Sequence, residues 1–173
     1  MIALATGLGS AFFHASETFV GRLFDYGGMY LGAAYMLSVN VRRWLLPSRR
    51  AVRLLFWGAV AGPVLLMIVD DQYAVTLYIA IGTFCCLLLE AFLFLRQRRS
   101  GMGIRYRWLG AYWLFFFVAF AFWWLDKKRL LCNPDNHWIS GHGAWHLVGA
   151  LALCFVYLFY RQFDVLRFRG ERS

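Results

Sequence analysis

The sequence predicts an all-α membrane protein, a bundle of six helices that each cross a bilayer. Apolar residues make up 61% of the 173 residues and charged residues only 16%, whereas a soluble domain carries about a quarter charged residues. Apolar runs of about 20 residues alternate with short basic clusters, which is typical of a polytopic helical membrane protein. The length suits one domain, so we expect a single integral membrane domain over residues 1–173.

The first two expected spans carry the polar residues of most interest. The first covers about residues 2–19 and holds Ser10 and His14. No basic region precedes it, so we expect a retained span and not a cleaved signal peptide. The second covers about residues 24–41 and has Asp25 near its start. It is rich in glycine and alanine, which let membrane helices approach closely.

Four further spans are expected over about residues 54–69, 73–95, 108–125 and 141–160. A basic segment containing Pro47 separates the second span from the third, and a short acidic connection at Asp70 and Asp71 joins the third to the fourth. The fifth span is dense in phenylalanine and tryptophan. A polar connection over residues 126–140 leads to the sixth.

The basic residues predict the orientation of the bundle. The connections after the second and fourth spans and the C-terminal tail hold 14 of the 18 Lys and Arg residues. Because basic loops stay on the cytoplasmic side, we expect both termini to be cytoplasmic. Anionic lipid headgroups then explain the net charge of +9 better than nucleic acid does, and we expect no nucleic-acid partner.

Histidines in two of the spans suggest a metal site. His142 and His146 are four residues apart at the start of the sixth span, so they project from one face of a helix. Neutral imidazole is a good ligand for zinc and similar metals. The expected topology places this pair, His14 and Asp25 at a similar depth in the outer half of the bilayer. Ionisable side chains inside a membrane usually mark function.

Each of these residues also has a structural interpretation. The histidine pair can form hydrogen bonds between helices instead of binding a metal. Ser10, one turn before His14, can return a hydrogen bond to its own helix backbone, and Asp25 can serve as an N-cap. His137 is interpreted as an ordinary surface residue. Glu90, expected to be buried in the fourth span, is interpreted as the partner of a nearby arginine.

Cysteine spacing adds no further site. Cys85 and Cys86 are adjacent within one span, Cys154 lies in another, and Cys132 lies in the connection before the sixth. No spacing among them indicates a disulfide framework or a thiolate zinc site.

Three motifs resemble those of the alkaline ceramidases. Residues 7–14, which read Gly-Leu-Gly-Ser-Ala-Phe-Phe-His, and then Asp25 with Met29 and Tyr30, are similar to the first motif of that family. Residues 142–146, His-Gly-Ala-Trp-His, resemble its closing His-Ala-Trp-Trp-His motif. The Trp-Leu-Asp stretch ending at Asp126, with Cys132 after it, is similar to the stretch that precedes the closing motif. The wider CREST superfamily, with progestin/adiponectin-type receptors, haemolysin-III-like and GPI-remodelling Per1-like proteins, shares the Ser/His, Asp and paired-His pattern.

The resemblance implies a zinc-dependent hydrolase that cleaves the amide bond of a ceramide-like lipid to a fatty acid and a long-chain amine. His14, His142 and His146 would be the zinc ligands, with a water whose pKa falls to about 7 at the fourth position. Asp25 would accept the proton of that water and pass it to the leaving nitrogen. Ser10 would donate to the developing oxyanion.

The chain also departs from the family pattern. The family usually has seven spans, and here its first motif begins at residue 7, so we expect the first of the seven to be missing. The acidic residues that form a calcium site in eukaryotic members would be lost with that span, so we expect no calcium. Residues 25–29 read Asp-Tyr-Gly-Gly-Met, whereas the family has Asp-Glu followed by Leu-Pro-Met. This difference concerns the substrate pocket more than the metal.

Two other functions stay open. A Per1-like hydrolase would act on another lipid ester or amide with the same chemistry, and a non-catalytic lipid receptor would keep the zinc as a structural element. In each case the partners expected are the bilayer and a membrane lipid, and no obligatory protein partner is evident. Compact loops suggest a bacterial inner-membrane protein with the metal site in the periplasmic half.

Overall fold

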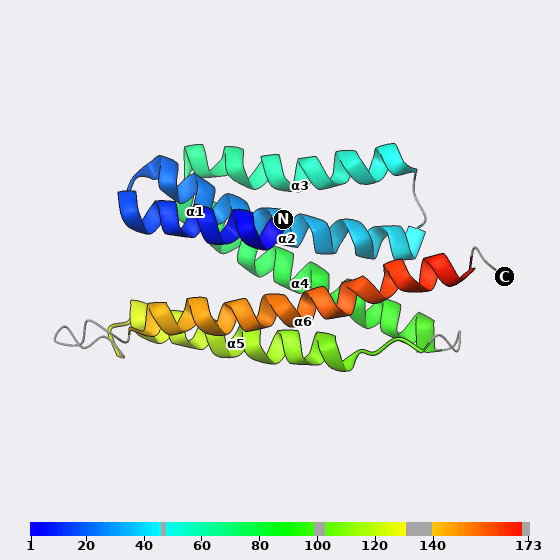
Figure 1. Cartoon of the computed structure of the whole chain (residues 1–173). Coiled ribbons are helices and arrows are strands. Elements are labelled where there is room, and N and C mark those ends of the chain that lie inside the picture. The colour runs from blue at the N-terminus through cyan, green and yellow to red at the C-terminus, as the bar shows by residue number, and fades with distance from the viewer. Residues whose placement is uncertain (46–47, 99–102, 131–139, 171–173) are drawn as a thin grey trace. The chain divides into compact units, whose positions relative to one another are not determined.

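The computed structural model describes residues 1–45, 48–98, 103–130 and 140–170, although some side chains within α4 and at the end of α6 (71–72, 75–84, 98 and 164–170) are not described. Within these residues the protein is all-helical, as predicted, with six helices and no strand (Figure 1). They are α1 (Ile2–Ser16), α2 (Phe19–Leu45), α3 (Arg49–Val69), α4 (Asp71–Arg98), α5 (Arg107–Lys127) and α6 (Gly141–Gly170). The chain forms two compact units, Met1–Met102 and Gly103–Ser173. The single membrane domain expected over 1–173 stays a prediction.

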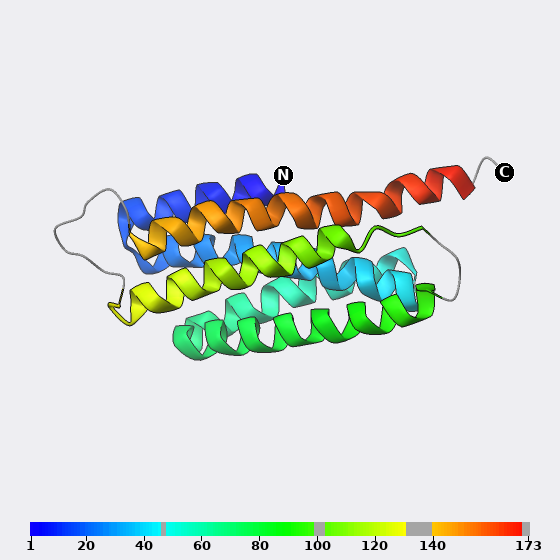
Figure 2. The ribbon, with the colours of Figure 1, turned by 90° about the horizontal axis from the view of Figure 1, so that it is seen from below.

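The first unit is built around α2, which packs against α1, α3 and α4, while α3 and α4 also pack against each other. Consecutive helices run in opposite directions (Figure 2). The core of this unit holds Tyr30 of α2, Met67 of α3 and Ala74 of α4, which are almost fully buried. Three helices therefore contribute to one apolar cluster.

The turn between α1 and α2 lies earlier than the sequence patterning indicated. A first span over 2–19 and a second from residue 24 were expected, but α1 ends at Ser16 and α2 begins at Phe19. Glu17 ends α1 in the left-handed conformation, with φ 49°, and its N–H donates to the Phe13 carbonyl. Thr18 then caps α2, because its Oγ1 accepts the Gly21 N–H at 3.0 Å. Hydrophobicity alone did not locate this turn, since apolar residues continue on both sides of it.

Glycines bring the backbones of α1 and α2 into direct contact. A Cβ placed on Gly9 would collide with the carbonyl oxygen of Phe24, and one on Gly28 would lie 2.5 Å from the Thr6 Cα. Both positions therefore require glycine. The close approach expected from the small residues of the second span is confirmed.

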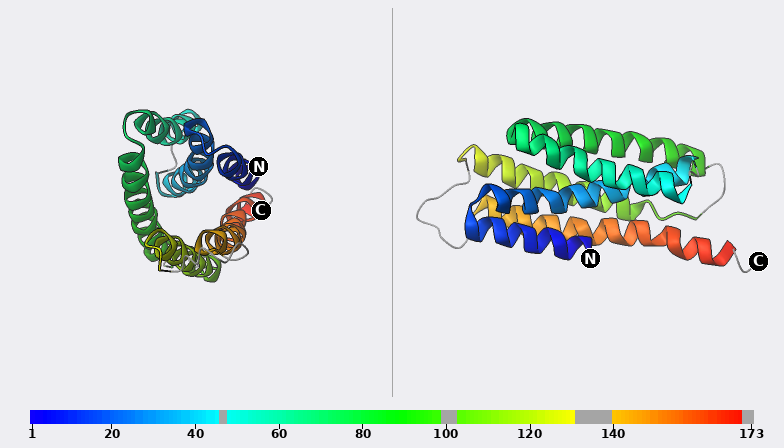
Figure 3. Two further views of the ribbon diagram at one scale, coloured as in Figure 1. Left: turned by 90° about the vertical axis from the view of Figure 1, so that its left-hand side faces the viewer. Right: turned by 90° about the horizontal axis from the view of Figure 1, so that it is seen from above.

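The second unit is an antiparallel pair of helices, α5 and α6 (Figure 3). Aromatic rings fill their contact: Phe155 of α6 stacks on Trp108 and Phe115 of α5, with ring centroids 6.1 Å and 5.2 Å apart. Trp145 of α6 meets the ring of Phe116 edge to face. The aromatic density of the fifth span thus serves packing between the two helices.

Among the described residues, three helices are long and apolar enough to cross a membrane: α3, α5 and the part of α6 from Gly141 to Phe163. This is fewer than the six spans expected. Helix α1 is apolar but has only 15 residues, below the length of about 20 that a straight span needs. Helix α2 is less apolar, with Asp25 and Asn40 along its length, and α4 is only partly covered by the described side chains. The protein is a membrane protein, and six spans remain a proposal.

A buried polar cluster joins α2 to α4 at the basic end of the first unit. Arg43 forms an ion pair with Glu90, and these side chains are 8% and 4% exposed. The Arg43 guanidinium also donates to Asn40 Oδ1 and to Gln97 Oε1, both at 2.9 Å. The interpretation of Glu90 as the partner of an arginine is confirmed.

Candidate metal centre

Helix α6 contributes two imidazoles that lie side by side. His142 and His146 stand in its first two turns, and their ring centroids are 4.8 Å apart with the rings nearly perpendicular. His142 is half-buried and His146 is exposed. The spacing of four residues was expected to place both rings on one face of the helix, and the structure confirms this within the second unit.

Two hydrogen bonds hold the first turn of α6. The Ser140 Oγ accepts the Gly143 N–H at 2.9 Å. Ser140 directly precedes α6 and is therefore its N-cap. Asp126, at the end of α5, accepts the Gly141 N–H at 3.1 Å through its Oδ1. In the sequence, Asp126 stands out only as part of a motif that resembles the family, and that motif gives it no role. No sequence spacing reveals this contact, because it depends on how α5 and α6 pack.

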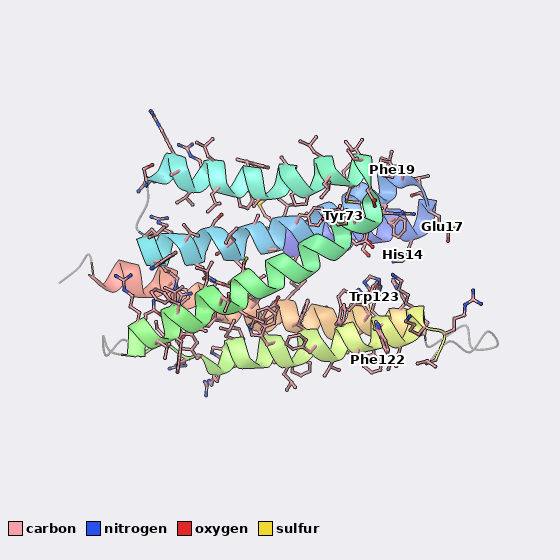
Figure 4. All side chains as sticks on the ribbon, turned by 180° about the vertical axis from the view of Figure 1, so that it is seen from behind. His14, Glu17, Phe19, Tyr73, Phe122 and Trp123 are labelled. Atoms are coloured by element: carbon pink, nitrogen blue, oxygen red, sulfur yellow. The ribbon has the colours of Figure 1, made fainter. Side chains whose placement is uncertain are left out.

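Helix α1 contributes His14 and Ser10, which are four residues apart and so share a face. His14 lies near the end of α1, at the same end of the first unit as Glu17, Phe19 and Tyr73 (Figure 4). The Ser10 Oγ is buried and has no hydrogen-bond partner among the described residues. Thr6, by contrast, donates to the Ile2 carbonyl at 3.0 Å. Ser10 therefore does not form the hydrogen bond to its own helix backbone that was the alternative interpretation.

Asp25 lies inside α2 and is half-buried. The alternative that it caps the second span is wrong, because α2 begins at Phe19 and Thr18 provides the cap. A Cβ on Gly9 would lie 3.3 Å from the Asp25 backbone nitrogen. Ser10 follows Gly9 directly, so Ser10 and Asp25 lie at the same level on two adjoining helices.

Comparison with known families matches residues 1–172 to the family described as Ceramidase. The chain belongs to the ceramidase family. No curated protein and no solved structure matches it. Membership in the ceramidase family supports hydrolysis of the ceramide type, in which an amide bond is cleaved. The family resemblance that the motifs predicted is confirmed.

The donor set of this ceramidase-family chain fits a metal. Three imidazoles are available on α1 and α6, and His14, His142 and His146 together have the ligand chemistry to bind a metal ion. Cys85, Cys86 and Cys154 are free thiols, and none lies within the motifs that carry the family resemblance. His137 and Cys132 lie outside the described residues. The roles of Ser10 and Asp25 and of the three histidines stay predictions.

Proposed function

We propose that this protein is a zinc-dependent intramembrane hydrolase that cleaves the amide bond of a ceramide-like lipid into a fatty acid and a long-chain amine. The observation that carries the proposal is the pair of imidazoles on α6, 4.8 Å apart, in a chain that matches the ceramidase family over nearly its whole length. The helices that are long and apolar enough to cross a bilayer agree with a substrate that resides in lipid.

His14, His142 and His146 would hold the zinc ion. Neutral nitrogen ligands suit zinc, and three of them leave one coordination position open, as in catalytic sites. When bound, zinc supplies a Lewis acid and lowers the pKa of a coordinated water to about 7. Because all three ligands are neutral, they do not reduce the positive charge that this chemistry needs.

Asp25 and Ser10 would manage the proton and the developing charge. Hydrolysis adds water across the carbon–nitrogen bond, so one proton must leave the water and reach the departing nitrogen. The half-buried Asp25 carboxylate would accept this proton and deliver it. The buried Ser10 hydroxyl, which no described residue engages, would donate a hydrogen bond to the oxygen of the former carbonyl.

The orientation follows from the distribution of basic residues. The end of the first unit at which α2 ends and α3 begins carries Arg42, Arg43, Arg49, Arg50 and Arg53. His14 lies near the other end of that unit (Figure 4). We therefore propose that the basic end of the first unit faces the cytoplasm, that both termini are cytoplasmic, and that the site lies in the periplasmic half of a bacterial inner membrane.

Metal content and product release test the proposal together. The detergent-purified full chain is compared with its His146→Ala and Asp25→Asn variants for zinc per chain and for fatty acid released from a ceramide. We expect about one zinc in the wild type, which His146→Ala loses, and retained zinc with strongly reduced turnover in Asp25→Asn. Asp70→Asn is the matched control, because Asp70 is an exposed carboxylate that caps α4. This variant should keep both zinc and turnover.

A matched ester lipid separates the amidase from a hydrolase of other lipids. Faster cleavage of the ester than of the amide would assign the chain to ester hydrolysis instead. Stoichiometric zinc without turnover of either lipid would favour a non-catalytic lipid receptor. A well-folded wild type that binds no metal would contradict the zinc hydrolase altogether.

A further inference from the structure

The start of α6 is attached to the end of α5 through one carboxylate. Asp126 accepts the backbone N–H of Gly141, the first residue of α6, across 15 residues of sequence. His142 follows Gly141 directly. We infer that Asp126 is a positioning residue that fixes His142 and His146 for metal binding, an inference that rests on the proposed zinc site.

The packing around this hydrogen bond leaves α6 little room to move. A Cβ on Gly141 would lie 2.8 Å from the Asp126 Cβ and 3.0 Å from the Phe122 carbonyl oxygen. Phe122 and Trp123 belong to the last turns of α5 (Figure 4). A shift of α6 towards α5 therefore produces a clash, and a shift away breaks the bond to Asp126. The first residue of α6 is held from both directions.

A second contact sets the rotation of α6 about its own axis. Trp145 lies between the two histidines in sequence, and its ring meets Phe116 of α5 with centroids 6.5 Å apart. Successive residues of an α-helix are turned by roughly 100°. With Trp145 directed at α5, His142 and His146 lie on the same side of that direction, turned from it by about 60° and about 100°. Asp126 fixes where α6 begins, and Phe116 fixes how it is turned.

The other cap of α6 cannot perform this task. Ser140 accepts the Gly143 N–H, but Ser140 precedes Gly141 directly and moves with the helix. It stabilises the first turn without linking it to α5. Among the described residues, the hydrogen bond from the Gly141 N–H to Asp126 links the two helices at this end. Metal ligands must be placed to about 0.2 Å, so a link to a second helix matters more for binding than for helix stability.

The experiment measures the zinc affinity of the purified full chain, with a competing chelator that buffers the concentration of free zinc. Removal of the acceptor in Asp126→Ala should weaken zinc binding by about tenfold, as loss of an outer-shell partner does. It should also change the visible absorption of the cobalt-substituted protein, which reports ligand geometry. Asp126→Asn keeps an acceptor of the same shape and should stay within about threefold of the wild type.

Asp70→Ala is the matched control. The Asp70 carboxylate accepts the Tyr73 N–H at 2.9 Å, so this variant removes the same kind of bond from α4, which carries no proposed ligand. It should lower the melting temperature as Asp126→Ala does, yet leave zinc affinity and the cobalt spectrum unchanged. Gly141→Ala provides a second test if Asp126→Ala does not fold, because its methyl group displaces the same helix start. It should also weaken zinc binding.

The outcomes separate this inference from the proposed function. If the wild type binds zinc and His146→Ala does not, while Asp126→Ala and Gly141→Ala bind it as tightly as the wild type, the zinc site stands and the positioning role of Asp126 is wrong. Equal weakening by Asp70→Ala would reduce Asp126 to a general stabilising residue and also overturn the inference. If the wild type binds no zinc, the proposed site is wrong and the role of Asp126 is lost with it.

Discussion

Arg43 on α2 and Glu90 on α4 form an ion pair in which both side chains are buried, and the Arg43 guanidinium also donates to Asn40 and Gln97. A charge in such a place depends on its partner, because the apolar surroundings cannot replace the lost hydration. The pair therefore fixes the contact between α2 and α4 more specifically than apolar packing would.

Removal of one member of this pair should destabilise the protein severely. We expect Arg43→Met to lower the free energy of unfolding by about 3–5 kcal/mol, since the Glu90 carboxylate is left buried without its counter-charge. The double variant Arg43→Met/Glu90→Met should recover most of this loss. Unfolding of the detergent-solubilised protein by a denaturant titration measures both. Arg50→Met, at an exposed arginine, should change stability by less than about 0.5 kcal/mol. A double variant as unstable as the single one would contradict the argument.

The contact between α1 and α2 should not tolerate an added methyl group. Gly28→Ala places its Cβ against the Thr6 backbone, and the strain of overpacking should cost about 1–3 kcal/mol. Gly27→Ala is the neighbouring control, because a Cβ at Gly27 meets nothing within 4 Å. Melting temperatures of the two variants measured side by side provide the comparison. Similar values for both would show that the helices do not touch at Gly28.

Zinc should stabilise the folded protein through its histidines. Chelation should lower the melting temperature of the wild type, and added zinc should restore it, because a ligand that binds only the folded state raises its stability. His142→Ala should melt at one temperature with or without chelator. His137→Ala, a histidine outside the proposed set, should respond as the wild type does. A chelator response that survives His142→Ala would place the metal elsewhere.

Labelling of introduced cysteines should reveal the orientation. In a chain with its four native cysteines replaced, Lys128→Cys should react with an impermeant maleimide in cells whose outer membrane alone is opened. Arg50→Cys should react only after the inner membrane is permeabilised, because basic connections remain cytoplasmic. The ratio of the two labelling yields is the measurement. The reverse pattern would invert the proposed topology and move the site to the cytoplasmic half.

The sequence revealed the helical class and the motif residues, because both depend on local patterns. Apolar runs identify membrane helices through their length. The spacing from His142 to His146 places both side chains on one face as soon as that single helix forms. The sequence also indicated that Glu90 needs an arginine, but it could not select Arg43, which lies 47 residues away. That choice depends on how α2 packs against α4.

Helix boundaries were harder to predict. An apolar run shows which residues can lie in a membrane, but it does not show where the hydrogen bonds of a helix begin and end. Helix α6 extends to Gly170, ten residues beyond the expected span, since a helix can continue into water. The α1–α2 turn was missed because its signals are polar and small: the left-handed Glu17 and the cap at Thr18. The role inferred for Asp126 was equally hidden, since its partner Gly141 has no side chain.

The glycine contacts between α1 and α2 also restrict how a lipid can reach Ser10 and Asp25. A hydrocarbon tail lying between two helices needs a gap of roughly 7–8 Å, twice the usual distance between carbon atoms in contact. At Gly9 and Gly28 the two backbones leave no such gap. The contact between α1 and α2 is therefore closed to acyl chains at these two positions. An acyl chain that reaches Ser10 and Asp25 must pass over the outer surfaces of this helix pair. The residues on those surfaces would then determine which tail lengths are preferred.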